Sequence, residues 1–443
     1  MAERDEAAIG ASDAAARPAI ATLLERLWRE HVGALRAALL RRFRDLDRVD
    51  EAASEAFAAA LRSWPEQGVP ARPLHWLIAT ANHRAIDALR RRARDEAALA
   101  ELAARMESGE WRGAASREAE PGDALEAEGP LGDDTLRLLF ACCHPALAPE
   151  AQLALMLREV AGLATEEIAR AFLVAPATLA QRIVRAKARL REVGATFERP
   201  EPAELPVRLA AVLRAIYLLF NEGYFASRGV QLQRVELAAE ALRLARLVAE
   251  LTDEPEAEGL LALLLLQEAR RAARVDAAGA LVPLEEQERS RVDRALLAEG
   301  VALLERAFAS RRFGPFTLQA AIAALHAEAS SHAATDWAQI VALYDLLLRC
   351  EPTPLVALNR AIAVGQCDGP AAALALLESL RLGGALDGYA PFHAAQGDAC
   401  RRLGRLAEAR GHLERALARA VQEPERHHYE RRLRELASEL PKG

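Results

Sequence analysis

The sequence predicts an all-helical protein with several domains, and three observations support this. Ala, Leu, Arg and Glu are abundant, and these residues favour helices. Aromatic residues make up only 5% of the chain, so strand-forming residues are scarce. Apolar residues also recur at helical spacing along most of the chain. With 443 residues, of which 52% are hydrophobic, the chain is long enough for two to four domains with buried cores.

Composition also indicates where in the cell the protein is located and which kinds of partner it can bind. A net charge of -7 does not favour a uniformly basic nucleic-acid coat protein, although it is compatible with local basic faces. Five cysteines in so long a chain do not form a disulfide framework. No apolar run reaches the length of a membrane span, and the first residues, MAERDEAAIG, lack the apolar core of a signal peptide. We therefore expect a cytoplasmic protein that does not contact a membrane.

Shifts in composition divide the chain into four parts. Residues 20–95 are predicted to form a first helical domain, and residues 96–132, rich in Glu, Gly and Pro, an acidic flexible linker. Residues 133–195 form a second, compact helical domain. Prolines near residue 200 then mark a boundary, and residues 203–443 are helical to the end, with a weak period of roughly 34 residues that is typical of tetratricopeptide helix pairs. An irregular helical domain is the alternative for this last part.

The first candidate binding segment comprises residues 75–94, HWLIATANHRAIDALRRRAR. Helical spacing puts an apolar stripe on one side of this segment and a basic face on another. Guanidinium groups neutralise phosphates, while aromatic and amide side chains stack on or hydrogen-bond to unpaired bases. The alternative is a solvated basic helix with its tryptophan in the core. The predicted DNA contacts here are Trp76, Asn82, His83, Arg84, Asp87, Arg90, Arg91 and Arg94.

The second candidate is residues 158–191, which predict a helix-turn-helix. A first helix ends near Val174, and Pro176 is well placed to open a second helix. The N-terminal residues of such a second helix can reach base edges in a major groove. A surface-charged helical hairpin without a DNA role is the alternative. The predicted outward-facing DNA contacts on this helix are Thr178, Gln181, Arg182, Arg185, Lys187 and Arg189.

The sequence contains little evidence for a catalytic site or a metal site. No set of nucleophile, base and acid and no phosphate-binding glycine loop is evident. The adjacent Cys142, Cys143 and His144 lack the spacing of a zinc ligand pair, so buried thiols are the preferred interpretation. We therefore expect no catalytic residues, no metal and no cofactor, and a protein that is not an enzyme.

The two basic segments together resemble a bacterial RNA polymerase sigma factor of the extracytoplasmic-function type. Residues 49–64, VDEAASEAFAAALRSW, are similar to the family's helix that grips the β′ subunit of polymerase. The resemblance implies that residues 75–94 melt the promoter and read its minus-ten element. It also implies that residues 158–191 read the minus-thirty-five element and that the linker runs through the polymerase channel. The polymerase contacts that it implies are Asp50, Glu51, Glu55 and Phe57.

The resemblance extends to a subgroup with a long tetratricopeptide-like C-terminal extension. The segments YLLFNEGYFAS (217–227), LVPLEEQERSRVDRALLAEG (281–300) and LNRAIAV (358–364) are similar to that extension, as is LQAAIAALHA (318–327). FACCHPALAPEAQ (140–152) also resembles the subgroup. The chain departs from the pattern at three positions. Ser54 replaces a glutamine expected in the polymerase-gripping helix, Leu173 replaces a glycine in the turn, and Val292 replaces a tryptophan.

The resemblance implies a promoter-specificity subunit that binds the β′ and β subunits of core RNA polymerase and promoter DNA. The extension is expected to regulate this activity, through masking of the DNA readers or through a regulatory protein bound to its concave surface. Two other classes stay open. One is a helix-turn-helix repressor or activator with a helical-repeat sensor, and the other is an interaction scaffold whose basic helices are merely solvated.

Overall fold

In the computed structural model the described residues form helices joined by turns and loops, with no β-strand among them, and this confirms the all-α class. None of the described helices is both long and apolar enough to cross a membrane. The chain divides into an N-terminal unit, Met1–Ala215, and a C-terminal unit, Ile216–Gly443, with the boundary inside α8 (Leu205–Tyr224). The structure describes residues 2–108, 131–172, 174–195, 197–198, 200–201, 203–224, 235–276 and 282–439.

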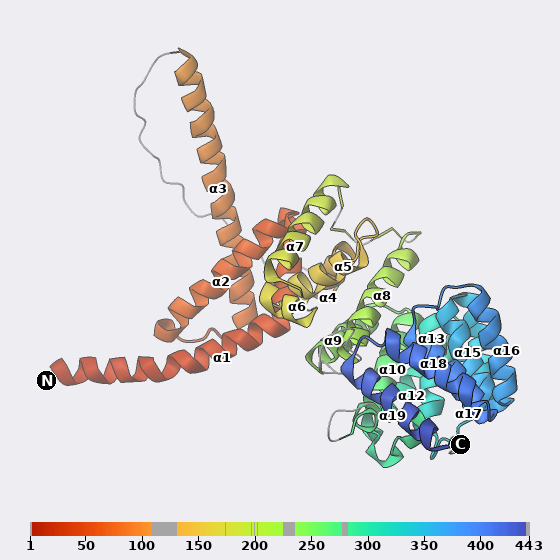
Figure 1. The fold of residues 1–443 in the computed structure, drawn as a ribbon. Helices are drawn as coiled ribbons and strands as arrows, with labels where there is room; N and C mark the ends of the chain where they lie inside the picture. The colour runs from red at the N-terminus through yellow and green to blue at the C-terminus, as the bar shows by residue number, and fades with distance from the viewer. Residues whose placement is uncertain are drawn as a thin grey trace. The chain divides into compact units, whose positions relative to one another are not determined.

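The N-terminal unit begins with three long helices that pack on one another: α1 (Ala2–Phe43), α2 (Leu46–Gln67) and α3 (Pro73–Ser108) (Figure 1). Asp45 caps α2, since its side chain accepts hydrogen bonds from the backbone N–H groups of Asp47 and Arg48. Helix α3 continues to Ser108, so its last turns lie in the range predicted to be a linker. Residues 109–130, the rest of that range up to α4, are outside the described residues.

The second half of the N-terminal unit contains the predicted helix-turn-helix. Its elements are α4 (Leu131–Cys142), α5 (Pro149–Leu155), the π-helix η1 (Met156–Val160), α6 (Thr165–Ala171) and α7 (Pro176–Glu192). The break falls where the sequence predicts it. Ala175 is extended and Pro176 occupies the first turn of α7, where a missing N–H leaves no hydrogen bond unmade. The expectation for the turn at Leu173 lies outside the described residues.

The C-terminal unit begins with helices arranged around α10, which is buried along most of its length. Helices α9, α12 and α13 pack against it, and Val292, the departure noted above, is buried beside them at 4% exposure. The elements are α9 (Val235–Leu251), α10 (Pro255–Ala269), α11 (Arg271–Arg274), η2 (Leu284–Glu286), η3 (Arg289–Arg291), α12 (Arg294–Ala309) and α13 (Pro315–Glu328).

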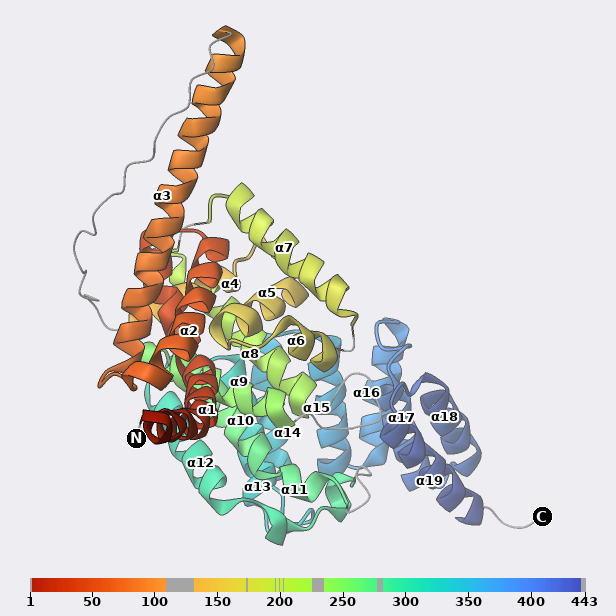
Figure 2. The ribbon, with the colours of Figure 1, turned by 90° about the vertical axis from the view of Figure 1, so that its left-hand side faces the viewer.

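The rest of this unit is a series of helices in which each packs on the next along the chain (Figure 2). Cys400, Ala409 and Leu413 from the predicted repeat meet in one hydrophobic cluster with Leu374 and Leu436. Helices α17 and α18 therefore pack on each other through small and apolar residues. These helices are α14 (Trp337–Cys350), α15 (Pro354–Cys367), α16 (Pro370–Leu382), α17 (Ala390–Arg402), α18 (Leu406–Arg419) and α19 (Glu423–Glu439).

Candidate nucleic-acid and polymerase interface

Helix α3 has a buried side and a basic exposed side. Ala81 and Ala85 are buried against the other helices of the unit. The charged side chains stand on the solvent side, where a nucleic-acid strand could reach them. Most of the predicted contacts on this helix are exposed: His83, Arg84, Asp87, Arg90, Arg91 and Arg94.

The other two predicted contacts on α3, Trp76 and Asn82, are partly engaged within the protein. The Trp76 ring packs edge-on against the buried ring of Trp64, with 5.5 Å between the ring centroids. Asn82 Oδ1 accepts a hydrogen bond of 3.2 Å from Arg42 in α1. Both side chains are half-buried, so each offers only part of its surface to a partner.

Helix α7 has a similar division into a buried and an exposed side. Leu179, Ile183 and Leu190 are buried, and they fix the orientation of the helix. Among the predicted contacts, Thr178, Gln181, Arg185 and Arg189 are exposed and Arg182 is half-buried. Arg189 also lies 2.7 Å from Glu192 on its own helix.

Lys187 does not face outward, contrary to the sequence-based expectation. Its side chain is only 8% exposed, and its Nζ lies 3.0 Å from Glu159 and 3.1 Å from Asp47. Burial disfavours the charged amine, but Glu159 and then Asp47 outweigh burial and raise the pKa of Lys187. Lys187 therefore belongs to a set of charged groups inside the N-terminal unit.

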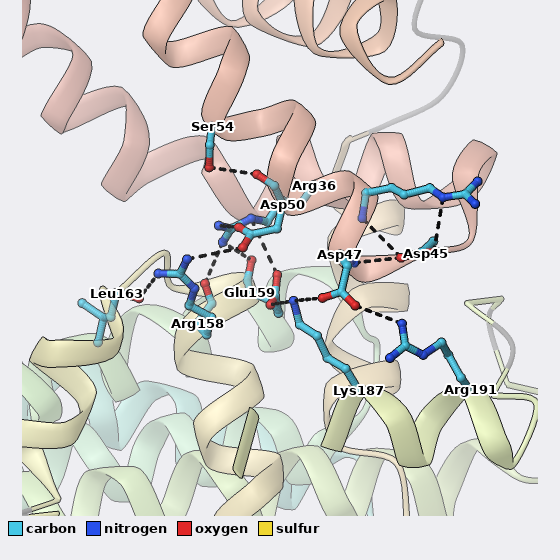
Figure 3. Close-up of polar contacts among 11 residues, drawn as sticks. Arg36, Asp45, Asp47, Asp50, Ser54, Arg158, Glu159, Leu163, Lys187 and Arg191 are labelled. Atoms are coloured by element: carbon cyan, nitrogen blue, oxygen red, sulfur yellow. Dashed lines mark hydrogen bonds and ion pairs between the residues drawn. The ribbon is translucent and has the colours of Figure 1, made fainter. Parts of the chain in front are cut away.

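We call this set the charge network, and it joins α1, α2, η1 and α7: Arg36, Asp47, Asp50, Arg158, Glu159, Lys187 and Arg191 (Figure 3). Arg36 is fully buried at its centre. It donates to the carbonyl oxygen of Arg158 at 2.6 Å and pairs with the carboxylates of Asp50 and Glu159. Buried charges are tolerated when they are paired, and the carboxylates of Asp50 and Glu159 each have cations beside them.

Asp50 belongs to the charge network and is also one of the polymerase contacts that the resemblance implies. In the structure its carboxylate binds Arg36 and lies 3.3 Å from Arg158. Burial alone would raise the pKa of Asp50, but the cations Arg36, Arg158 and Lys187 outweigh burial and lower it. This carboxylate is ionised and already bound to arginines within the unit.

The remaining polymerase contacts predicted on α2 differ in exposure. Glu51 is exposed, 3.6 Å from Arg92 of α3, and Glu55 is half-buried. Phe57 is 8% exposed and packs edge-on against Trp28, with 4.9 Å between centroids. Ser54, in place of the expected glutamine, donates to the carbonyl oxygen of Asp50 at 2.8 Å.

A close backbone contact accompanies the charge network. A Cβ atom placed on Gly33 of α1 would overlap the carbonyl oxygen of Val160 in η1. The indole N–H of Trp28 donates to the carbonyl oxygen of Gly162 at 2.7 Å. The first three helices and the helix-turn-helix region are thus joined by direct packing as well as by charge.

The sequence contains a sign of the charge network that helical periodicity alone does not reveal. Arg36 stands between buried Leu35 and Leu39 in an apolar run, and Glu159 stands in another such run. A charged residue at a core position indicates a buried, paired charge. The identity of the partner depends on the tertiary fold and cannot be found from one segment.

The cysteine motif lies in the core. Cys142 and Cys143 are buried free thiols, and burial is the first cause of the raised pKa of each. Within the described ranges, no group of three or more His, Cys, Asp or Glu side chains is arranged to hold a metal ion.

Comparison with protein families matches three parts of the chain. Residues 27–95 match Sigma-70 region 2, residues 137–190 match Sigma-70 region 4, and residues 208–308 match a family of unknown function, DUF6596. The first match contains the basic side of α3, and the second contains the helix-turn-helix. A chain with both regions in this order is a sigma factor, which binds RNA polymerase and recognises promoters.

A curated relative from Rhizobium meliloti (strain 1021), described as uncharacterized protein R00370, is 46% identical over 404 residues. The alignment covers 91% of this chain and 93% of the relative. The chain belongs to the same protein family as this relative. No solved structure matches the chain.

Proposed function

We propose that the protein is an extracytoplasmic-function sigma factor whose two Sigma-70 regions read the two elements of a promoter. Helix α7 would read the upstream element in the major groove through Thr178, Gln181, Arg182 and Arg185. Helix α3 would hold the separated strand along its basic side. The protein itself would catalyse no reaction and would act in the cytoplasm.

The observation that carries this proposal is the exposed side of α7. Gln181 and Arg185 are exposed on the side of the helix opposite the buried Leu179 and Ile183. Amide and guanidinium groups are suited to purine edges. Arg189 remains a candidate phosphate contact, whereas Lys187 would first have to leave its carboxylate partners.

On α2, we propose Glu51 and Glu55 as polymerase contacts, because their carboxylates are at least partly exposed. Asp50 would join them only after separating from Arg36. Phe57 would act by supporting α2 from the core side, since it packs on Trp28. For the C-terminal unit, we propose a tetratricopeptide-like fold that regulates the activity of the sigma factor.

The test is transcription by core RNA polymerase and the full-length protein on a library of randomised promoters. Transcripts that share a motif of two elements would support the proposal. Arg182→Ala should then weaken recognition by about 1–3 kcal/mol and relax the preference at one position of the upstream element. Arg26→Ala, an exposed change on α1, is the matched control.

A different result would favour a different class. Specific binding of duplex DNA by the protein alone, together with no promoter-specific transcript, would indicate a repressor or activator. Trp76→Ala separates two roles of that side chain. Loss of open complexes alone would indicate stacking on bases, whereas equal loss of closed and open complexes would indicate a role in folding.

A further inference from the structure

Four elements of the C-terminal unit bring three arginines and a histidine together near Tyr224 of α8. Arg270 and Arg274 come from the end of α10 and from α11, Arg289 comes from η3, and His326 lies in the last turn of α13. Arg274 lies over the Tyr224 ring at 4.6 Å from its centroid. We call Arg270, Arg274, Arg289 and His326 the arginine cluster.

The two arginines at the centre of this cluster are incompletely hydrogen-bonded. Arg270 is 5% exposed; its Nη2 donates to Gln287 at 2.8 Å, but its buried Nε has no acceptor. Arg289 donates from Nη1 to the carbonyl oxygen of His326 at 2.9 Å, while its Nε and Nη2 are buried without an acceptor. Buried donors of this kind are costly unless something accepts from them.

Neither of these arginines forms an ion pair within the part of the chain that the structure describes. Three acidic residues on these segments have other partners. Glu268 lies 2.5 Å from Arg271, and Glu285 and Glu286 pair with Arg432 and Arg431 of α19. The neighbouring segments 225–234 and 277–281 contain no Asp or Glu in their sequences. These segments therefore supply no carboxylate to neutralise the cluster.

The cluster has a positive local potential. Burial lowers the pKa of Arg270 to about 10; Tyr224 opposes this effect, and Arg274 and Arg289 add to it. Burial, then Arg270, Arg289 and His332, lower the pKa of His326 to about 3. His326 is consequently neutral near pH 7 and has one N–H to donate. Arg270 keeps its charge, so a bound anion would stabilise this region.

We propose that Arg270 and Arg289 form a binding site for a small anion that carries a phosphate group. The charge of a phosphate monoester, about -2 near neutral pH, matches two guanidinium cations. The planar fork of arginine also matches pairs of phosphate oxygens. Both arginines lie within the match to the family of unknown function, at residues 208–308. The site does not rest on the proposed role in transcription.

The experiment is thermal unfolding and calorimetric titration of the full-length protein with inorganic phosphate, adenosine monophosphate or succinate. Sodium chloride at equal ionic strength corrects for screening. Phosphate at a hundredfold excess over its Kd should raise the Tm of the C-terminal unit by about 5–10 °C, in a saturable manner. A response to inorganic phosphate identifies the free ion as sufficient, and a response to the nucleotide alone identifies a phosphorylated metabolite.

Two variants and one control decide the assignment. Arg289→Gln should abolish the saturable shift, whereas Arg349→Gln, an exposed change on α14, should keep it. Arg270→Met should lose the response to phosphate without losing stability in its absence, because an unpaired buried charge has been removed.

Several outcomes would overturn the proposal. One is no saturable phosphate effect in the wild type together with an unstable Arg270→Met variant; the hydrogen bond to Gln287 would then be enough to hold Arg270 in place. An unchanged shift in Arg289→Gln would also overturn it. Equal binding of succinate would reject the phosphate assignment. None of these measurements involves polymerase, so their failure is distinct from failure of the proposed function.

Discussion

Arg36 in the N-terminal unit and Arg270 in the C-terminal unit are both buried arginines, with exposures of 0% and 5%. Arg36 pairs with the carboxylates of Asp50 and Glu159, which come from other helices of its unit. Arg270 has a glutamine oxygen as its side-chain acceptor, and after burial the groups that lower its pKa are the cations Arg274 and Arg289. One arginine is neutralised by the protein, and the other is not.

The difference separates a structural charge from a candidate binding charge. In the charge network, each cation lies beside a carboxylate from another helix, so the network helps to hold those helices together. In the arginine cluster, positive charge is concentrated, and this favours a ligand rather than internal cohesion. Four predictions test this contrast.

Arg36→Met should destabilise the N-terminal unit by about 3–5 kcal/mol, because Asp50 and Glu159 would lose their shared buried partner. Urea-induced unfolding followed by tryptophan fluorescence measures the effect. Arg26→Met, an exposed change on the same helix, should alter stability by less than about 0.5 kcal/mol. Equal stability of the two variants would show that the charge network contributes nothing.

Acid should destabilise the C-terminal unit through His326. Its pKa is about 3 in the folded protein against 6.5 ordinarily, so below pH 6.5 the unfolded chain takes up a proton that the folded chain does not. Stability should therefore fall as pH falls, by about 3 kcal/mol at most between pH 6.5 and pH 4.

Unfolding of the His326→Asn variant over this pH range measures that contribution. The stability of the variant should depend less on pH than that of the wild type. His427→Asn is the matched control, because His427 is exposed in α19. Parallel pH profiles for the wild type and His326→Asn would contradict the prediction.

Gly33→Ala should destabilise the N-terminal unit by about 1–3 kcal/mol, because the added Cβ overlaps the Val160 carbonyl oxygen. In an unobstructed helix the same change stabilises by about 1 kcal/mol. Gly411→Ala in α18 supplies that comparison, since the nearest atom to its Cβ is the end of the Arg415 side chain at 4.0 Å. Opposite signs in urea unfolding are expected, and stabilisation by both changes would rule out the close contact.

Arg191→Met should have the smallest effect, less than about 1 kcal/mol. Arg191 lies 2.9 Å from Asp47, but both side chains are more than half exposed. The comparison with Arg36→Met in the same assay tests whether burial decides the strength of a pair within one network. A loss as large as that of Arg36→Met would show that exposure is a poor guide here.

The helix-turn-helix was predictable because its signals are local. Apolar spacing and Pro176 together define the break and the buried side of α7. The prediction that Lys187 faces outward is wrong, although its position in the helix indicates that it is buried. It lies four residues after buried Ile183 and three before buried Leu190, which puts it on the same side of the helix. For Lys187, position in the helix predicts burial, whereas charge does not.

The charge network could not be predicted in detail because its pairs are distant in sequence. Arg36 and Glu159 are 123 residues apart. Periodicity indicates which side of a helix is buried, but not which helix covers it. The arginine cluster was missed for the same reason, since Arg270, Arg289 and His326 lie on separate elements that only the fold brings together.

The pairing of cations on α7 has a consequence for how salt would affect DNA binding. Binding of a cation to DNA phosphate normally releases condensed counterions, and this release makes the affinity depend on salt concentration. On α7, Lys187, Arg189 and Arg191 already have carboxylates of the protein beside them. A phosphate that binds these three would displace a carboxylate, so the net gain from released ions would come mainly from Arg182 and Arg185. The salt dependence of DNA binding by α7 would then be shallower than its number of positive charges implies.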